Sequence, residues 1–353
     1  MRKKSFIEFL CLATILLGII ACSEKKLTQP FIHTINVKGE LFIPSDSLKD
    51  PRFINIIDTH LIIGNYKGSP LVELYDIKTG NREARFLTIG NGPFEFLCLG
   101  NVQPVSKRKE IYISDLFIRK LVKYNLSDIL DKPNTPYKEI FEVPKDSELL
   151  ISKIGKVQNG IVAESMDPKG RIVMLDANGS VLSYFGQYPN KDLVDPNLTE
   201  VLNAKLYASA ITINPSMNKV ALATYQAGMI DLFDLSENGV DPVWSYQEFY
   251  PEGIKVLPMA GEFVVAHTDD GRNGFLGICS TDKYVYSVYS GKKFGVRGDN
   301  SYTYGDIVYV VSWDGRESFK FQLNQPVIRL VVDSEDEIMY GLTAEHDIYK
   351  FVI

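Results

Sequence analysis

The sequence has few of the residues and motifs that mark common catalytic sites. Its four histidines are scattered, with no pair at metal-ligand spacing and no HExxH motif. It also has no G-x-S-x-G motif and no P-loop. The sequence therefore provides no evidence for a zinc enzyme, a serine hydrolase with a nucleophile elbow or a P-loop nucleotide-binding protein.

Cysteine is equally scarce. Of the four cysteines, Cys11 and Cys22 fall at the start of the chain, which leaves Cys98 and Cys279, each in an apolar setting. Two cysteines do not make a disulfide framework. We expect both to be buried side chains that pack as small hydrophobic groups.

The chain also lacks a block of basic residues. It has 38 Lys and Arg against 44 Asp and Glu, for a formal net charge of −6, and this acidic balance argues against a nucleic-acid partner. With 353 residues, 45% of them hydrophobic, the chain is long enough to bury a sizeable core.

The first residues have the pattern of an export signal. A basic start, "MRKKS", precedes the apolar run "FIEFLCLATILLGII" and then "IIAC", and a run this short indicates a cleavable signal rather than a spanning helix. The run resembles a bacterial lipoprotein signal with its lipobox. The resemblance implies cleavage before Cys22 and lipidation of that residue, which would anchor the chain to a membrane. An uncleaved N-terminal anchor is the alternative.

These features divide the chain into a signal peptide at 1–21, a flexible tether at 22–30 and a folded domain at 31–353. Under either interpretation of the N-terminus, the domain lies outside the cytoplasm. We expect it in the cell envelope, held by lipid to the outer membrane, with the side of that membrane left open.

A repeated hairpin dominates the rest of the chain. Hydrophobicity alternates with period two, and no stretch keeps a helical period over three turns. Every copy of the hairpin is preceded by another apolar strand, and five copies are followed by one more. The six copies begin at Leu61, Ile111, Ile161, Val220, Tyr284 and Ile338.

Six four-stranded units at intervals of roughly 45–65 residues predict an all-β fold, a six-bladed β-propeller. The last hairpin has no strand after it, whereas "HTINVKGELFI", from His33, is unassigned. We therefore expect the N-terminal strand to join the last blade and close the ring, which leaves no sheet face exposed. Two stacked sandwiches or a long solenoid are the alternatives.

Three stretches interrupt the repeat. Residues 186–206 read as a loop with a short helix, residues 250–274 as an extra hairpin between blades four and five, and "FGVRGDNSYTYG" as a break inside blade five. Long excursions from a rigid scaffold often carry binding surfaces. Their tyrosines either line a surface for a carbohydrate or peptide or cover the core; these are Tyr188, Tyr250, Tyr302 and Tyr304.

The stretch "IGNGPFEF" resembles the G-x-G-P-G-E-F signature of the TolB-like six-bladed propellers, many of them lipoproteins of Gram-negative bacteria. Phe94 replaces the usual glycine. The stretches "TDKYVYSVYSGKK" and "VYVVSWDGR" are also similar to that group. The resemblance implies the fold and an envelope lipoprotein, and no activity. The matching residues, which are also candidates for binding, are Gly90, Gly92, Pro93, Glu95 and Phe96.

The same stretch has three chemical interpretations. A phosphate-binding loop is disfavoured because a third glycine is missing and Pro93 removes an amide donor. Alternation places Glu95 on the opposite face from Phe94 and Phe96. The Glu95 carboxylate then either fixes the crossover between the first two blades or faces the axial channel.

The segment "HTDDGRNG" has crowded oxygen ligands on a flexible turn. Asp269, Asp270 and Asn273 are therefore candidate calcium ligands. Their spacing does not match an EF-hand loop, which favours a solvated turn.

The function that we expect is a binding or scaffold module for an envelope protein, a peptide or a carbohydrate, with no catalytic residue assigned. The alternative is a calcium-dependent hydrolase or lyase with its site in the axial channel. Several carboxylates and amides converging on the axis at one depth would favour the enzyme, whereas an apolar or wide, wet channel would favour binding.

Overall fold

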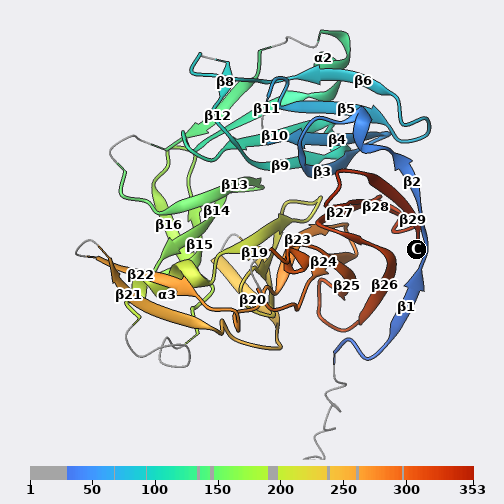
Figure 1. Cartoon of the computed structure of the whole chain (residues 1–353). Helices are drawn as coiled ribbons and strands as arrows, with labels where there is room; N and C mark the ends of the chain where they lie inside the picture. Colours follow the sequence, from blue (N-terminus) through green and yellow to red (C-terminus); the bar gives the residue numbers. More distant parts are fainter. Residues whose placement is uncertain are drawn as a thin grey trace, which may run out of the picture. The chain divides into compact units, whose positions relative to one another are not determined.

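Six four-stranded antiparallel sheets, one of them extended by a parallel fifth strand, lie between Thr34 and Val352 and form the blades of a β-propeller (Figure 1). The computed structural model describes residues 30–66, 68–92, 94–132, 136–143, 147–189, 198–236, 239–259, 262–295 and 298–353. The predicted fold class is confirmed.

The inner strands close a ring. Each blade places its first strand at the axis, and every such strand contacts the first strand of both neighbouring blades. The strands of the first three blades, from the axis outwards, are β3 (Pro51–Ile57), β4 (His60–Asn65), β5 (Val72–Asp76) and β6 (Arg82–Phe86); β9 (Leu99–Val105), β10 (Glu110–Asp115), β11 (Lys120–Asn125) and β12 (Lys138–Glu142); and β13 (Ile151–Val157), β14 (Gly160–Asp167), β15 (Gly170–Leu175) and β16 (Val181–Phe185).

The last three blades follow the same order, and each of the last two takes its outermost strand from the N-terminal segment. Their strands are β17 (Ser209–Ile213), β18 (Lys219–Thr224), β19 (Met229–Ser236) and β20 (Gly239–Gln247); β23 (Phe275–Ser280), β24 (Tyr284–Tyr289), β25 (Gly305–Ser312), β26 (Ser318–Val327) and β1 (Thr34–Val37); and β27 (Arg329–Val332), β28 (Ile338–Leu342), β29 (Ile348–Val352) and β2 (Gly39–Ile43).

The N-terminal closing segment, residues 31–45, differs from the prediction in one respect. It forms two strands instead of one: β1 pairs in parallel with β26 of blade five, and β2 pairs antiparallel with β29 of blade six. Gly39 lies at the crossing, where a Cβ would come within 2.5 Å of the Phe351 ring. The main chain of Gly39 instead bonds the Asn324 side chain. The segment therefore closes the last blade and also ties it to its neighbour.

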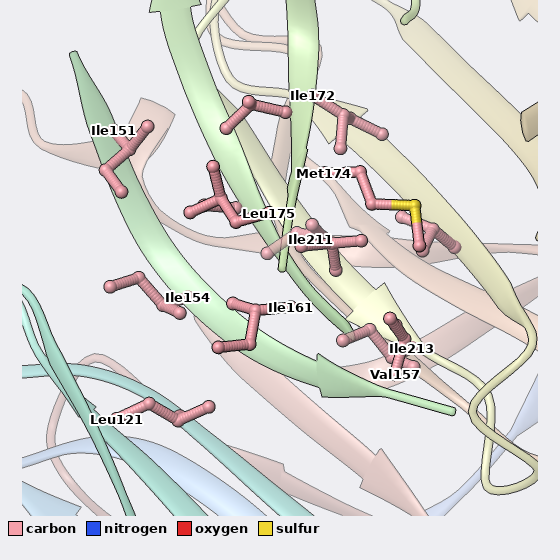
Figure 2. Close-up of a cluster of buried hydrophobic side chains, with 14 of the residues drawn as sticks. Leu121, Ile151, Ile154, Val157, Ile161, Ile172, Met174, Leu175, Ile211 and Ile213 are labelled. Carbon is pink, nitrogen blue, oxygen red and sulfur yellow. The ribbon is translucent and has the colours of Figure 1, made fainter. Parts of the chain in front are cut away.

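The core lies between the blades. One hydrophobic cluster joins blades two, three and four, and others join blades one and two, four and five, five and six, and six and one. Figure 2 shows the first of these, in which Leu121 of β11 and Ile211 and Ile213 of β17 lie on either side of blade three. Since neighbouring blades cover both faces of a sheet, all residues of β4, β15 and β24 are buried.

The turns between outer strands are built from aspartate and glycine. In blade one the Asp76 carboxylate accepts hydrogen bonds from the amides of Lys78 and Thr79, and Gly80 follows with a φ of 70°. In blade three the Asp176 carboxylate accepts hydrogen bonds from two turn amides, and Gly179 has a φ of 85°. The aspartate satisfies the turn amides and the glycine adopts the left-handed conformation without steric cost.

Two of the predicted interruptions have the predicted form. Residues 200–206 form a helix that the Thr199 side chain caps at the Leu202 amide, and an antiparallel hairpin lies between blades four and five. Residues 190–197 of the first interruption lie outside the described residues. The elements outside the blades are α2 (Leu126–Asp131), α3 (Glu200–Leu206), β7 (Thr88–Ile89), β8 (Glu95–Phe96), β21 (Ile254–Met259) and β22 (Glu262–His267), with 3-10 turns η1 (Ser45–Ser47), η2 (Ser106–Arg108) and η4 (Ser301–Thr303).

The predicted signal peptide and the lipidation site Cys22 also lie outside the described residues, as does the tether up to residue 29. Phe31–Ile353 is a compact unit by itself. Within the described ranges, no helix has both the length and the apolar character that a membrane crossing requires.

Candidate functional site

The Glu95 side chain of the motif loop turns back onto its own loop. Its Oε2 accepts a hydrogen bond of 2.6 Å from the amide of Gly92. A Cβ at Gly90 would overlap this carboxylate, and one at Gly92 would lie 2.8 Å from Oε2. The two glycines are thus required by the space that the carboxylate occupies. Pro93 lies outside the described residues.

The two phenylalanines around Glu95 have different environments. Phe96 is fully buried in the cluster between blades one and two, whereas the Phe94 side chain is 54% exposed. Both rings contact the edge or face of Tyr137, with centroids 5.5 and 6.0 Å away. The buried Lys120 ammonium lies 4.6 Å from the Phe96 ring and donates to the Glu95 carbonyl oxygen. These contacts hold the crossover against blade two.

Exposed apolar side chains gather on the turns next to this crossover. The Asp115 carboxylate, itself buried, accepts hydrogen bonds from the amides of Leu97 and Phe117 and so joins the two turns. Leu97 and Phe117 are 36% and 68% exposed. The predicted envelope-protein partner was assigned to no particular surface and stays a prediction.

The proposed calcium ligands face protein groups. The Asp270 carboxylate pairs with Lys293 at 3.0 Å, and the Asn273 amide donates to the carbonyl oxygen of Tyr302. Asp269 is exposed, and its carbonyl oxygen accepts from the amide of Gly295. Within the described ranges, His, Cys, Asp and Glu side chains form no group of three that would hold a metal ion. Calcium binding at this turn stays a prediction.

The tyrosines of the interruptions pack against neighbouring elements. Tyr188 and Tyr250 lie over a small cluster that α3 and β19 form, and the Tyr188 hydroxyl donates to the Ser165 carbonyl. The Tyr302 ring contacts Phe294, and the Tyr304 ring lies under the ammonium of Lys292. Carbohydrate or peptide binding by these residues stays a prediction.

A cavity of about 170 Å³ lies on the axis of the ring, and all six inner strands line it. Several of its lining side chains are polar although the strands that carry them are mainly apolar. Each of the six inner strands contributes at least one polar residue to the lining; examples are Asn55, Asn101, Lys153, Thr212, Ser280 and Arg329.

The inner strands run level with one another, so their first residues meet at one end of the cavity. Lys153 of β13 donates to the carbonyl of Ser209, the first residue of β17. Arg329, the first residue of β27, donates to the carbonyl of Leu276 in β23. Lys153 and Arg329 therefore reach the same end of the cavity from blades three and six, which are opposite in a ring of six.

Lys153 has a charged partner beside the cavity. Its ammonium lies 2.5 Å from a carboxylate oxygen of Glu164, which is buried, and 4.8 Å from the centroid of the Tyr225 ring. Glu164 also accepts from the Ser152 hydroxyl and the Ser209 amide. Burial disfavours the ammonium, but the adjacent carboxylate outweighs it and raises the pKa of Lys153 above its ordinary value.

The main chain at Lys153 is unusual for a lysine. Its φ is 43°, in the left-handed region, and the pairing of β13 with β14 shifts register between Ser152 and Gly155. A bulge of this kind redirects a side chain and is common next to binding sites. Here it accompanies a lysine that lines the cavity.

The match to a family model decides the identity. The model described as TolB-like 6-blade propeller-like matches residues 28–335. The chain belongs to this family. The family membership agrees with the six blades and confirms the resemblance found in the motif loop and in blade five.

A solved structure shares the fold of this TolB-like propeller: a member of the DUF4221 family from Bacteroides vulgatus matches with a TM-score of 0.57 and 11% identity, over 90% of this chain and 98% of the other. A structure described as that of an exported protein from Bacteroides fragilis also matches, with a TM-score of 0.49 and 12% identity, over 91% of this chain and 98% of the other. A search of curated proteins found no match.

Glu95, which the sequence offered as a candidate for the axial channel, is not among the residues that line the cavity, and sequence reasoning missed Lys153 and Arg329. Both are basic residues of inner strands: Lys153 lies in "ISKIGKV", which also carries Lys156, and Arg329 lies in "VIRLVVD". A charge within a strand that should pack on the axis was the signal that was available, since buried charges need a partner.

Proposed function

We propose that this TolB-like propeller is a lipid-anchored module of the cell envelope that binds a small ligand in its axial cavity. One observation carries the proposal: inner strands that are mainly apolar place polar and charged side chains on a shared cavity. A ring that served only to pack its blades would gain nothing from burying such groups, because their desolvation costs free energy. A few polar groups converging on a concave site are typical of ligand pockets.

The charged groups at the axis favour binding over calcium-dependent hydrolysis. Calcium sites are built from carboxylate and carbonyl oxygens. The charged residues that line the described cavity, Lys153 and Arg329, are both basic. Their positive charge would repel a calcium ion, so the binding module is the interpretation that this lining supports.

A cavity-filling variant tests the proposal. Ala210→Phe places a phenyl ring among the lining residues, whereas Ala177→Phe places one on an exposed turn of blade three as a matched control. Calorimetric titration of the wild type with monosaccharides, sugar acids and short peptides should identify at least one ligand. Its binding should be lost in Ala210→Phe and kept in Ala177→Phe.

Two results would contradict the cavity as the site. One is a wild-type protein that binds no member of the panel. The other is a ligand that Ala210→Phe binds as tightly as the wild type does, while circular dichroism shows that the variant is folded.

The anchor is tested separately. In cells, Cys22→Ala should move the protein from the membrane fraction to the soluble envelope fraction, and the wild-type N-terminal peptide should carry the mass of the attached lipid. Membrane association that the substitution leaves unchanged would contradict lipidation at Cys22. Digestion of intact cells by an added protease would then report on which side of the outer membrane the domain lies.

A further inference from the structure

The two basic side chains at the cavity differ in their charge compensation. Lys153 has the Glu164 carboxylate at 2.5 Å. Within the described part of the chain, the hydrogen bonds of the Arg329 guanidinium go to the carbonyl oxygens of Leu276 and Ile328. Carbonyl groups orient a guanidinium but do not neutralise it. The group of Lys153, Glu164 and Arg329 therefore leaves one positive charge at this end of the cavity.

The position of Arg329 is built into the ring. Both of its carbonyl contacts involve Nη1, which fixes one edge of the guanidinium against the start of β23 and β27. Gly277 leaves the space for it: a Cβ there would come within 2.8 Å of the Arg329 Cδ. An arginine held in this way presents its remaining donors in a fixed plane, and that plane matches the paired oxygens of a carboxylate or phosphate.

The volume and the neighbouring groups limit the ligand. The cavity of about 170 Å³ is large enough for a small-molecule ligand. The lining also supplies the Asn101 amide and the Thr212 and Ser280 hydroxyls, which lie 3.0 Å apart and bond each other. Each hydroxyl oxygen keeps a lone pair for a further donor, so these groups suit the hydroxyls of a polar ligand.

We infer that the cavity binds a small organic acid and that Arg329 pairs with its oxyanion group. The inference rests on the proposed function and adds the chemical class of the ligand and the residue that selects it. A chain with a net charge of −6 repels anions on average. The uncompensated Arg329 would provide the local positive charge that attracts an anion to the axis.

The test uses three probes that differ at one carbon: galacturonate, galactose 6-phosphate and galactose. We expect the wild type to bind at least one of the two anions more than tenfold tighter than galactose in calorimetric titration. Arg329→Gln should weaken that binding by about 10- to 100-fold, as expected for a charge-assisted hydrogen bond. Arg329→Lys should give an intermediate loss because it keeps the charge and loses the planar fork.

Arg316→Gln is the matched control, because Arg316 is an exposed arginine whose guanidinium pairs with Asp314. It should bind the probes as the wild type does. Thermal unfolding of each variant without ligand checks the fold, and Arg329→Lys keeps the test valid if Arg329→Gln unfolds.

The outcomes separate the two claims. If galactose binds as tightly as both anions and Ala210→Phe abolishes this binding, the cavity is the site and the oxyanion inference is wrong. If an anion binds equally to the wild type and to both Arg329 variants, Arg329 is not the selecting residue and the inference is also wrong. If neither the anions nor the neutral sugar binds the wild type, the inference is wrong; the wider panel with Ala210→Phe decides the proposed function separately.

Discussion

The motif loop at 87–96 and the axial cavity differ in opposite ways between sequence and structure. The sequence of the loop suggests a binding site that its contacts do not show, and the sequence of the inner strands does not suggest the polar cavity that they line. The loop has glycines, a proline and a carboxylate in a pattern that suggests a binding site, yet its carboxylate bonds an amide of the same loop. The inner strands read as packing segments, yet they bring two basic side chains to a shared cavity. Residue types alone therefore do not tell a carboxylate that holds its own turn from a charged side chain that lines a cavity.

The largest effect should come from removing what both regions depend on, the closed ring. Deleting residues 31–45 removes β1, β2 and the buried Phe31, which packs on the rings of Tyr246 and Tyr309. Two outer strands would then lose their partners. We expect the melting temperature to fall by more than about 10 °C, or folding to fail, since loss of several kcal/mol exceeds typical stability margins.

A chain that begins at Pro30 is the control, because it keeps both strands, and should unfold as the full domain does. An unchanged melting temperature after deletion of 31–45 would show that the ring does not depend on this closure.

The second largest loss of stability should follow from neutralising the buried Glu164 carboxylate beside the cavity. Glu164→Gln leaves the Lys153 ammonium without its partner in a site where three donors meet the carboxylate. Removing one partner of a buried ion pair lowers the free energy of unfolding by about 3 kcal/mol or more. Denaturant unfolding should show this decrease. Glu335→Gln, at an exposed turn, is the control and should change the free energy of unfolding by less than about 0.5 kcal/mol.

In the motif loop, Gly90→Ala should reduce stability without changing ligand binding. The added Cβ would overlap the Glu95 carboxylate, and overpacking of this kind costs about 1–3 kcal/mol. Asn91→Ala, at the exposed neighbouring position, should leave stability unchanged. Denaturant unfolding and titration with the ligand identified for the wild type measure the two properties. Loss of binding in a stable Gly90→Ala protein would move the functional site to the loop.

The corresponding variant of Glu95 sharpens the comparison further. Glu95→Gln keeps the shape of the side chain and weakens the bond to the Gly92 amide from a charge-assisted to a neutral one, a change of about 1 kcal/mol. We expect a small decrease in stability by thermal unfolding and wild-type titration behaviour. Intact stability with abolished binding would show that this carboxylate contacts the ligand.

The smallest effect is a difference in pH dependence at the cavity. Because the folded-state pKa of Lys153 is raised, its contribution to stability is complete below the unfolded value of about 10.4 and is lost as the pH rises through the folded value. Lys153→Arg stays charged in that range. The wild type should therefore lose more stability than Lys153→Arg above about pH 10.5 in denaturant unfolding. Parallel curves would show that the Lys153 charge does not stabilise the fold.

Much of the architecture follows from local pattern. The alternation of apolar residues, the Asp and Gly turns and six repeats predict six blades, and the unassigned N-terminal segment predicts how the ring closes. The division of that segment into β1 and β2 was missed, because strand periodicity does not say which neighbour a strand pairs with. Pairing depends on the crossing at Gly39, where Phe351 and Asn324 from two blades meet the chain.

The sequence by itself determined the blades, the position of the turns and the family, because each depends on residues close together in the chain. The contacts of the charged groups follow from the tertiary structure instead. Lys153 and Arg329 are 176 positions apart in the numbering (329 minus 153), and ring closure brings both to one end of the same cavity. Glu95 bonds its own loop because the glycines beside it leave space for the carboxylate. Charge compensation and cavity shape arise from contacts between distant segments, which periodicity and spacing do not encode.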